Sequence, residues 1–181
     1  MKSKRSDFLI PAPRYSKQRG ASLLEGIAYL GIAAMVILGA VSLLTGAFSS
    51  AKSNQTSEEV VALRTAVRKL YIGQPYPGAS MLPSLIPAKA MPNTLVIDPV
   101  ALTAKNTWGG VVSVDGDPVT GTFKITYNLV PEDVCVNIVS GANGWASIAG
   151  STTITVMPPT AAQATGLCAS PGGASLSFTA T

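Results

Sequence analysis

The sequence contains no histidine. Histidine is the usual general base beside a nucleophilic serine or cysteine, and it is also the commonest metal ligand in proteins. Its absence excludes the Ser-His and Cys-His nucleophile pairs and most metal-dependent active sites. The composition therefore argues against an enzyme, and we expect no catalytic residues and no cofactor.

Cysteine is nearly as scarce, with Cys135 and Cys168 the only two. Two cysteines without histidines or clustered carboxylates are too few for a zinc site, so we expect no metal. We predict instead that they form a disulfide that holds the carboxy-terminal segment onto a sheet. A disulfide indicates an oxidising compartment such as the periplasm.

Charged residues make up only 12% of the chain and are unevenly distributed. The first twenty positions hold six of the thirteen basic residues and one acid, Asp7, a local balance of 6 − 1 = +5; the remainder holds seven basic and eight acidic residues, 7 − 8 = −1. The bulk of the chain thus has no basic patch for a phosphate backbone, and we expect no nucleic-acid binding. The six basic residues are Lys2, Lys4, Arg5, Arg14, Lys17 and Arg19.

A long uncharged apolar run extends from Gly26 to Ala51. A helix of about 20 residues crosses the hydrocarbon core of a bilayer, so this run can span a membrane. The basic flank lies only on its amino-terminal side, which places that side in the cytoplasm and everything after Lys52 outside. The run is too long for an ordinary secretory signal peptide. A simple membrane anchor would not explain Glu25, since an acid at the head of an apolar segment needs a partner.

The segment Lys17-Gln18-Arg19-Gly20, followed by Ala21-Ser22-Leu23-Leu24-Glu25 and the apolar run, resembles the processing site of type IV prepilins. The resemblance implies that a prepilin peptidase removes a leader, residues 1–20, by cutting after Gly20. Ala21 would become the new, methylated amino terminus, although the family usually has a large apolar residue there. Glu25 would then pair with the terminal amine of a neighbouring subunit during assembly.

Beyond the membrane segment the helical pattern continues through residues 52–72. Apolar side chains recur at spacings of three and four in Val60, Leu63, Val67 and Leu70, while Glu58, Glu59, Arg64, Arg68 and Lys69 fall elsewhere. The apolar stripe predicts a packing face for a globular domain. We therefore expect one helix of about 50 residues, from Ala21 to about Tyr71, whose first part (21–51) forms the transmembrane and filament-core segment.

The remaining residues, 73–181, are predicted to form a globular head. A loop rich in proline and glycine follows Gly73, and short β-rich runs predict one antiparallel sheet on the amphipathic half of the helix. The expected fold class is α+β, and the resemblance to prepilins implies a type IV pilin fold. Val134–Val139 is ambiguous, but Pro131-Glu132-Asp133 before it favours a short helix. Predicted strands are Thr94–Ile97, Val111–Val114, Thr122–Tyr127, Thr152–Met157 and Ser175–Ala180.

Two short motifs in the head are interpreted as turns. Asp115-Gly116-Asp117 resembles half of a calcium loop but lacks the other ligands, so we expect a hairpin turn between two strands. Trp108-Gly109-Gly110 is expected to be a turn with a packed aromatic ring.

The head also resembles the type IVb branch of the family, in Trp108-Gly109-Gly110, in the segment Glu132–Asn137 and in Cys168 shortly before a last strand. The twenty-residue leader fits that branch too. The resemblance implies a major pilin that polymerises with itself into a surface filament for adhesion, aggregation or conjugative mating contact. The implied partners are the prepilin peptidase, the inner-membrane pilus assembly machinery and the membrane itself.

The implied location is the inner membrane, with the head in the periplasm, and then the extracellular pilus. A pseudopilin of a type II secretion system is the main alternative, although such proteins often use calcium in place of a disulfide. A membrane-tethered periplasmic protein with enzymatic activity is a third alternative, but the sequence offers no nucleophile-base pair and no metal cluster.

Overall fold

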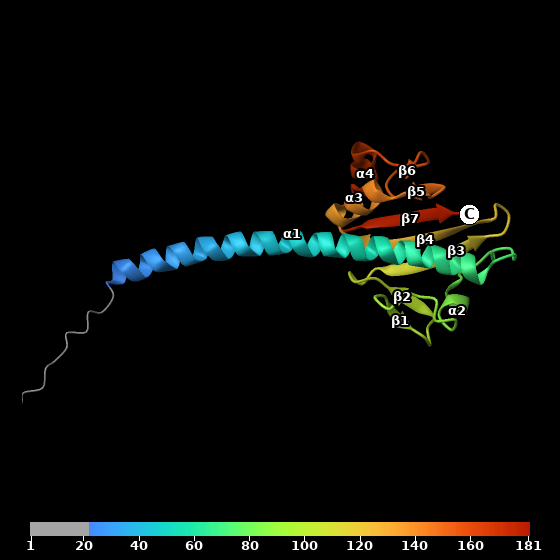
Figure 1. Cartoon of the computed structure of the whole chain (residues 1–181), viewed down its shortest axis with the longest axis horizontal. Helices are drawn as coiled ribbons and strands as arrows, with labels where there is room; N and C mark the ends of the chain where they lie inside the picture. The colour runs from blue at the N-terminus through green and yellow to red at the C-terminus, as the bar shows by residue number, and fades with distance from the viewer. Residues whose placement is uncertain (1–21) are drawn as a thin grey trace, which may run out of the picture. The chain divides into compact units, whose positions relative to one another are not determined.

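The computed structural model describes residues 22–181, so Gly20 and Ala21 lie outside the described residues. One long helix, α1 (Leu23–Leu70), opens the described chain (Figure 1). Its bounds confirm the predicted helix to within two residues at its start and one at its end. The chain separates into two compact units, Met1–Leu43 and Leu44–Thr181.

The first unit, in its described part, consists of the amino-terminal half of α1 alone. Its large apolar side chains are all exposed, from 85% for Leu23 to 54% for Val41. By length and composition, α1 is the one helix among the described residues that could cross a membrane.

The second unit, called the head below, contains the rest of α1 and a seven-stranded antiparallel sheet. The strand order is β1-β2-β3-β4-β7-β5-β6, so the last strand of the chain pairs with β4 and β5 inside the sheet (Figure 1). The strands are β1 (Val96–Asp98), β2 (Thr103–Lys105), β3 (Val111–Asp117), β4 (Thr122–Val130), β5 (Ser147–Ala149), β6 (Thr153–Ile154) and β7 (Ala174–Ala180).

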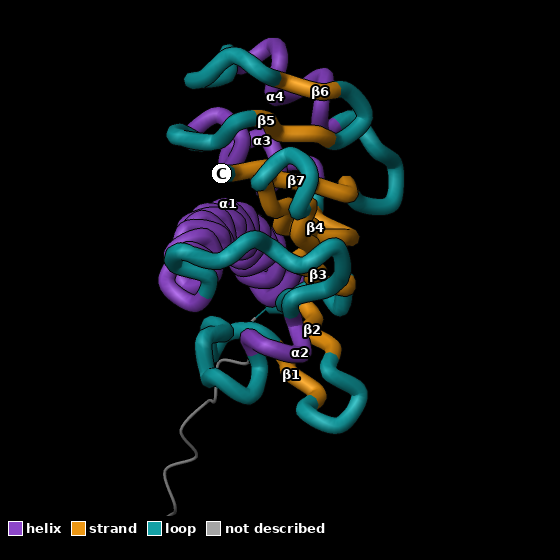
Figure 2. The backbone as a smooth tube through the Cα atoms, turned by 90° about the vertical axis from the view of Figure 1, so that its right-hand side faces the viewer, coloured by secondary structure: helices purple, strands orange, loops and turns teal. Residues whose placement is uncertain are grey.

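Three short helices flank α1 in the head. The helix α2 (Leu82–Leu85) lies on the side of β1 and β2, whereas α3 (Glu132–Gly141) and α4 (Ala161–Cys168) lie on the opposite side, with β5 and β6 (Figure 2). The predicted helix after Pro131 is confirmed as α3. The start of α4 is fixed by a capping box, in which Thr160 Oγ1 accepts from the Gln163 N–H and Gln163 Oε1 accepts from the Thr160 N–H.

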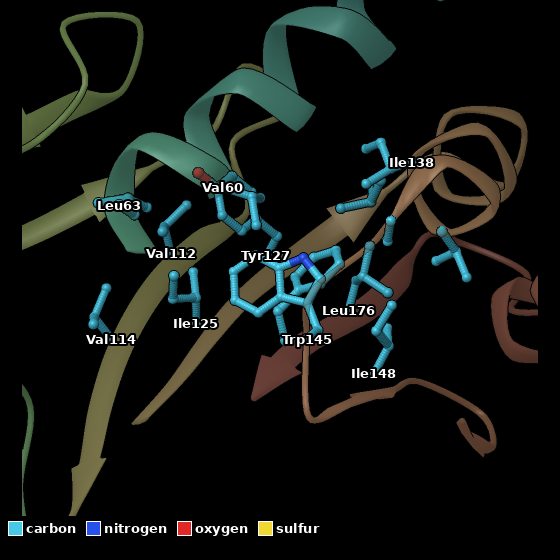
Figure 3. Packing of buried hydrophobic residues seen from close by; sticks show 14 of the residues in the cluster. Val60, Leu63, Val112, Val114, Ile125, Tyr127, Ile138, Trp145, Ile148 and Leu176 are labelled. Atoms are coloured by element: carbon cyan, nitrogen blue, oxygen red, sulfur yellow. The ribbon is translucent and has the colours of Figure 1, made fainter. Parts of the chain in front are cut away.

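The core lies between α1 and one face of the sheet (Figure 3). Val60, Leu63 and Val67 are buried, which confirms the predicted apolar stripe, and Leu70 is partly buried against the core. Facing them are buried side chains from the central strands, among them Val112, Val114, Ile125, Tyr127 and Leu176. Since side chains alternate along a strand, the other face of the sheet is polar; there the hydroxyls of Thr126 and Ser177 are 2.9 Å apart.

The predicted turn at Asp115-Gly116-Asp117 is wrong, because all three residues lie in β3 and the turn follows at residues 118–121. Gly116 is needed for another reason: a Cβ there would lie 2.3 Å from the Pro77 carbonyl oxygen. Asp117 organises the turn by accepting hydrogen bonds from the Val119 and Thr120 N–H groups at 2.9 and 3.3 Å. Hydrogen bonds from the Thr120 side chain and these N–H groups lower the pKa of the Asp117 carboxyl.

Glu59 lies outside the predicted apolar stripe and is nevertheless buried. Its side chain is only 5% exposed, next to Val60 in the contact with the sheet. Glu59 Oε1 accepts from Gln55 Nε2 at 2.9 Å, and Glu59 Oε2 accepts from the Tyr127 hydroxyl at 3.4 Å. Hydrogen bonds of this kind make burial of a carboxylate tolerable.

Short elements differ most from the sequence-based prediction. The predicted strand Thr152–Met157 shrinks to β6, two residues long, because Val156 is 70% exposed and leaves the sheet. The strand predicted at Thr94–Ile97 occurs one to two residues later, as β1. The strands β2 and β5 and the helices α2 and α4 were not predicted.

Candidate assembly site on the apolar helix

Glu25 lies in the first turn of α1, where the partial positive charge of the helix terminus favours an acid. Its neighbours Leu23 and Leu24 are 85% and 78% exposed. The hydroxyl of Tyr29, one turn later, donates to Glu25 Oε1 at 3.4 Å, the long end of the hydrogen-bond range. This contact was not predicted, although the spacing of four residues could have indicated it. The carboxylate is exposed and can accept further hydrogen bonds.

The apolar surface that follows Glu25 is continuous around the helix. From Ile27 to Phe48 the large apolar side chains are more than half exposed. A Cβ added at Gly26, Gly31, Gly39 or Gly46 would meet no other atom within 4 Å. Exposed apolar patches of this extent are rare on monomeric soluble proteins. In water, such a surface is expected to be covered by lipid or by another protein.

The disulfide is present in the head. Cys135 of α3 and Cys168 at the end of α4 are both fully buried, with an S–S distance of 2.01 Å and a Cα–Cα distance of 5.8 Å. The bond differs from the prediction in what it joins, because it links two helices and not the carboxy-terminal segment to the sheet. The bond ties together the two ends of the segment that contains β5, β6 and α4.

Arg64 connects α1 to the loop after α3. Its guanidinium lies 4.8 Å from the centre of the Trp145 ring, and Nη1 donates to the Gly144 carbonyl oxygen at 2.8 Å. Trp145 in turn packs on Phe178 of β7, with ring centres 5.1 Å apart. Partial burial, and to a lesser extent the charge of Arg68, lower the pKa of Arg64. The sequence pattern predicted only that Arg64 lies outside the apolar stripe, so this contact was not predicted.

The Trp108-Gly109-Gly110 segment forms the expected turn. Buried Asn106 organises it: Oδ1 accepts from the Trp108 and Gly110 N–H groups at 3.0 and 2.9 Å, and Nδ2 donates to the Asn128 carbonyl oxygen at 2.7 Å. Gly109 has a φ of +80°, a conformation that glycine adopts without a steric penalty. The turn is a structural feature that joins β2 and β3. Within residues 22–181, no group of three or more His, Cys, Asp or Glu side chains could hold a metal ion.

The family is decided by comparison with known proteins. The family model described as PilS N terminal matches residues 50–181. The chain belongs to the PilS family of type IVb pilins. Among solved structures, this pilin is similar to the crystal structure of the type IV b pilin from Salmonella typhi, with a TM-score of 0.53 and 28% identity over 68% of this chain and 94% of that chain. A comparison with curated proteins gave no match.

The match to the family model begins at residue 50, so it rests on the second half of α1 and the head of the pilin. The fold is that of a type IV pilin, a long apolar helix packed on an antiparallel sheet. Family and fold are those of a structural subunit and not those of an enzyme family.

Proposed function

We propose that this pilin is the major subunit of a type IVb pilus and polymerises through the apolar half of α1. A peptidase removes residues 1–20 by cutting after Gly20, so that Ala21 carries the mature, methylated amino terminus. The observation that carries the proposal is the exposed apolar surface of α1 with Glu25 as its single charged residue between Ser22 and Ala51.

Glu25 acts in this proposal as the partner of the Ala21 amine of a neighbouring subunit. Four residues separate the two positions along the helix, about 6 Å at the standard rise, so parallel helices offset by one turn bring amine and carboxylate together. Paired, the two charges offset the loss of their hydration inside the filament. A subunit in any other register would bury both charges without partners, which selects the correct stagger.

The head follows the helix out of the inner membrane into the periplasm and then to the outside of the filament. Its disulfide suits an oxidising compartment, and the polar outer face of the sheet suits contact with water. The prepilin peptidase and the inner-membrane assembly machinery are the expected partners. The filament serves adhesion, aggregation or conjugative mating contact.

The test is Glu25→Val, which removes the charge and keeps the helix apolar. We expect surface filaments to fall at least about tenfold, since an unpaired buried amine costs more than the 1.4 kcal/mol that corresponds to a factor of ten. Leader cleavage and the melting temperature of the head should stay unchanged, because Glu25 lies outside the head. Pilin in the sheared surface fraction is the measurement.

The matched control is Tyr29→Phe, which removes the hydroxyl bonded to Glu25 and leaves the carboxylate in place. It should assemble normally, because the proposed partner of Glu25 is the amine of another subunit. Wild-type filament levels in Glu25→Val would contradict the pairing.

A further inference from the structure

The head has an acidic feature on one flank and a basic feature on the other. After Lys124, residues 125–181 contain only two charged residues, Glu132 and Asp133. Both lie exposed in the first turn of α3, on the flank formed by α3, α4, β5 and β6 (Figure 2). Within residues 125–181, the charge on that flank is therefore concentrated in one acidic turn.

A groove with basic residues lies on the opposite flank, between the second half of α1 and the turn after α2. The cavity has a volume of about 630 Å³. Four of its eight lining residues are alanines, and Lys69 of α1 and Lys89 of the turn lie on its two sides. Both lysines are exposed, and within residues 22–181 neither ammonium group has a hydrogen-bond or ion-pair partner. The groove thus combines space with two available positive charges.

We propose that this groove is the docking site for the start of α3 of another copy of the pilin, with Glu132 and Asp133 of one subunit facing Lys69 and Lys89 of the next. The inference rests on the proposed filament function and adds the contact between heads. Two carboxylates meet two ammonium groups, and the small side chains of the groove leave room for the first turn of a helix.

The positions of the two surfaces exclude their pairing within one subunit. They lie on opposite sides of α1 (Figure 2) and at different levels along it. Asp133 accepts a hydrogen bond from Ser49 Oγ, whereas Lys69 lies 20 residues further along the helix, about 30 Å at the standard rise. Each subunit of a helical filament has several neighbours at different offsets. A copy with a parallel helix shifted by about 30 Å, which is not the neighbour whose amine faces Glu25, brings the acidic turn to the groove.

The kind of contact also fits a filament. The acidic turn and the basic groove are unlike surfaces, so each subunit can use one to bind a copy ahead and the other to bind a copy behind. Such heterologous contacts continue indefinitely unless the rotation closes a ring, whereas a closed dimer pairs one surface with itself. Lys52 is a weaker candidate for the basic partner, because it is partly buried and already donates to Thr107 Oγ1 at 3.1 Å.

The test is a charge swap in the full-length pilin. The variants K69E/K89E and E132K/D133K place like charges across the contact, and each should lower sheared surface filaments by more than about tenfold, as expected for like-charge contacts at an interface. The four substitutions together restore opposite charges and should restore filaments to near the wild-type level. All four substituted residues are exposed, so cleavage of the leader and the melting temperature of the head should not change.

The matched control is K105E, which reverses an exposed lysine of β2 outside the groove and should assemble normally. Wild-type filament levels in K69E/K89E, or no recovery in the fourfold variant, would overturn the docking proposal. Either result would leave the filament function intact, because that function is tested separately by Glu25→Val. The groove would then serve another partner or none.

A second measurement uses wild-type filaments and a carbodiimide, which joins carboxylates to amines in direct contact. Mass spectrometry should identify Lys69 or Lys89 linked to Glu132 or Asp133, a bond that the separation along α1 forbids within one chain. Links from these lysines only to other carboxylates would contradict the proposed contact.

Discussion

The chain contains two tyrosine–glutamate hydrogen bonds of equal length in very different surroundings. In the apolar helix, Tyr29 donates to Glu25 at 3.4 Å and is 64% exposed. In the head, Tyr127 donates to Glu59 at the same distance, but Tyr127 is fully buried and Glu59 is 5% exposed. The same pair of side chains thus serves two purposes: the head uses it internally, whereas the apolar helix leaves its carboxylate open to another molecule.

Two glycines of the head differ in the same way from those of the apolar helix. In the head, Cβ atoms at Gly110 and Gly116 would collide with backbone atoms at 1.8 and 2.3 Å. In the apolar helix, a Cβ at Gly39 would meet nothing within 4 Å. The head is therefore closely packed at these two positions, whereas the apolar helix leaves its side chains exposed.

Breaking the disulfide should give the largest difference between the two regions, because it destabilises the head and leaves the apolar helix unaffected. Cys168→Ser opens a loop of 33 residues, for which chain-entropy arguments give about 3 to 4 kcal/mol of lost stability. That is a large share of the 5 to 15 kcal/mol typical of a domain. We expect low pilin levels and no filaments, while leader cleavage, which concerns only the helix side, continues.

Urea unfolding of the purified head, with and without reductant, measures the effect. The Cys135→Ser variant is the control, because it removes the same bond from the other side and should lose the same stability. Equal unfolding midpoints for wild type and both variants would show that the bond contributes nothing to the head.

Adding one methyl group to a glycine should affect stability in the head and not in the apolar helix. Gly110→Ala forces a Cβ against the Asn128 carbonyl group, and we expect a loss of about 1 to 3 kcal/mol in head stability, typical of overpacking. Gly39→Ala places the same methyl group in open space and should leave the melting temperature of the head unchanged. Thermal unfolding of the two variants side by side decides whether the head is as closely packed as described; equal melting temperatures would argue that it is not.

The smallest expected effect concerns the buried Tyr127. Burial, and then the charge of Glu59, raise the pKa of Tyr127 well above its ordinary value. In the unfolded chain a tyrosine loses its proton near pH 10, so above about pH 10 only the unfolded state releases this proton, and head stability falls as the pH rises. In Tyr127→Phe this part of the decrease should vanish, at the cost of about 1 kcal/mol at neutral pH for the lost hydrogen bond.

Urea midpoints measured from about pH 8 to pH 11 provide the test, since one proton changes the slope by about 1.4 kcal/mol per pH unit. The two curves should lie a constant distance apart at low pH and converge above about pH 10. Parallel curves over the whole range would show that Tyr127 ionises equally well in the folded head.

The long-range pattern of the fold could be predicted from the sequence because it is repeated many times. An apolar run without charges and a stripe at spacings of three and four define α1 over dozens of residues, so single exceptions do not matter. Glu59 is such an exception. This charged residue lies outside the predicted stripe, and its partners Gln55 and Tyr127, the latter 68 positions away, make its burial possible.

The short elements could not be predicted because nothing local defines them. The strands β2 and β5 are three residues long and exist through pairing with distant strands. The helix α4 had a local signal, the Thr160 and Gln163 spacing of a capping box after two prolines, which could have been used. Gly116 shows the opposite error: a residue typical of turns is required by the close approach of Pro77 from outside the hairpin.

The candidate assembly site could be proposed from the sequence because a single acidic residue beside a long apolar run is visible there directly. The groove with Lys69 and Lys89 could not, since the two lysines are 20 residues apart and are brought together by the turn after α2.

The account depends most on where the mature chain begins, because the proposed partner of Glu25 exists only if Ala21 is a free terminus. The decisive measurement is the mass of the intact protein in filaments sheared from cells. It should equal residues 21–181 less two hydrogens for the disulfide, with or without one methyl group. Surface filaments whose subunits still contain residues 1–20 would contradict the account.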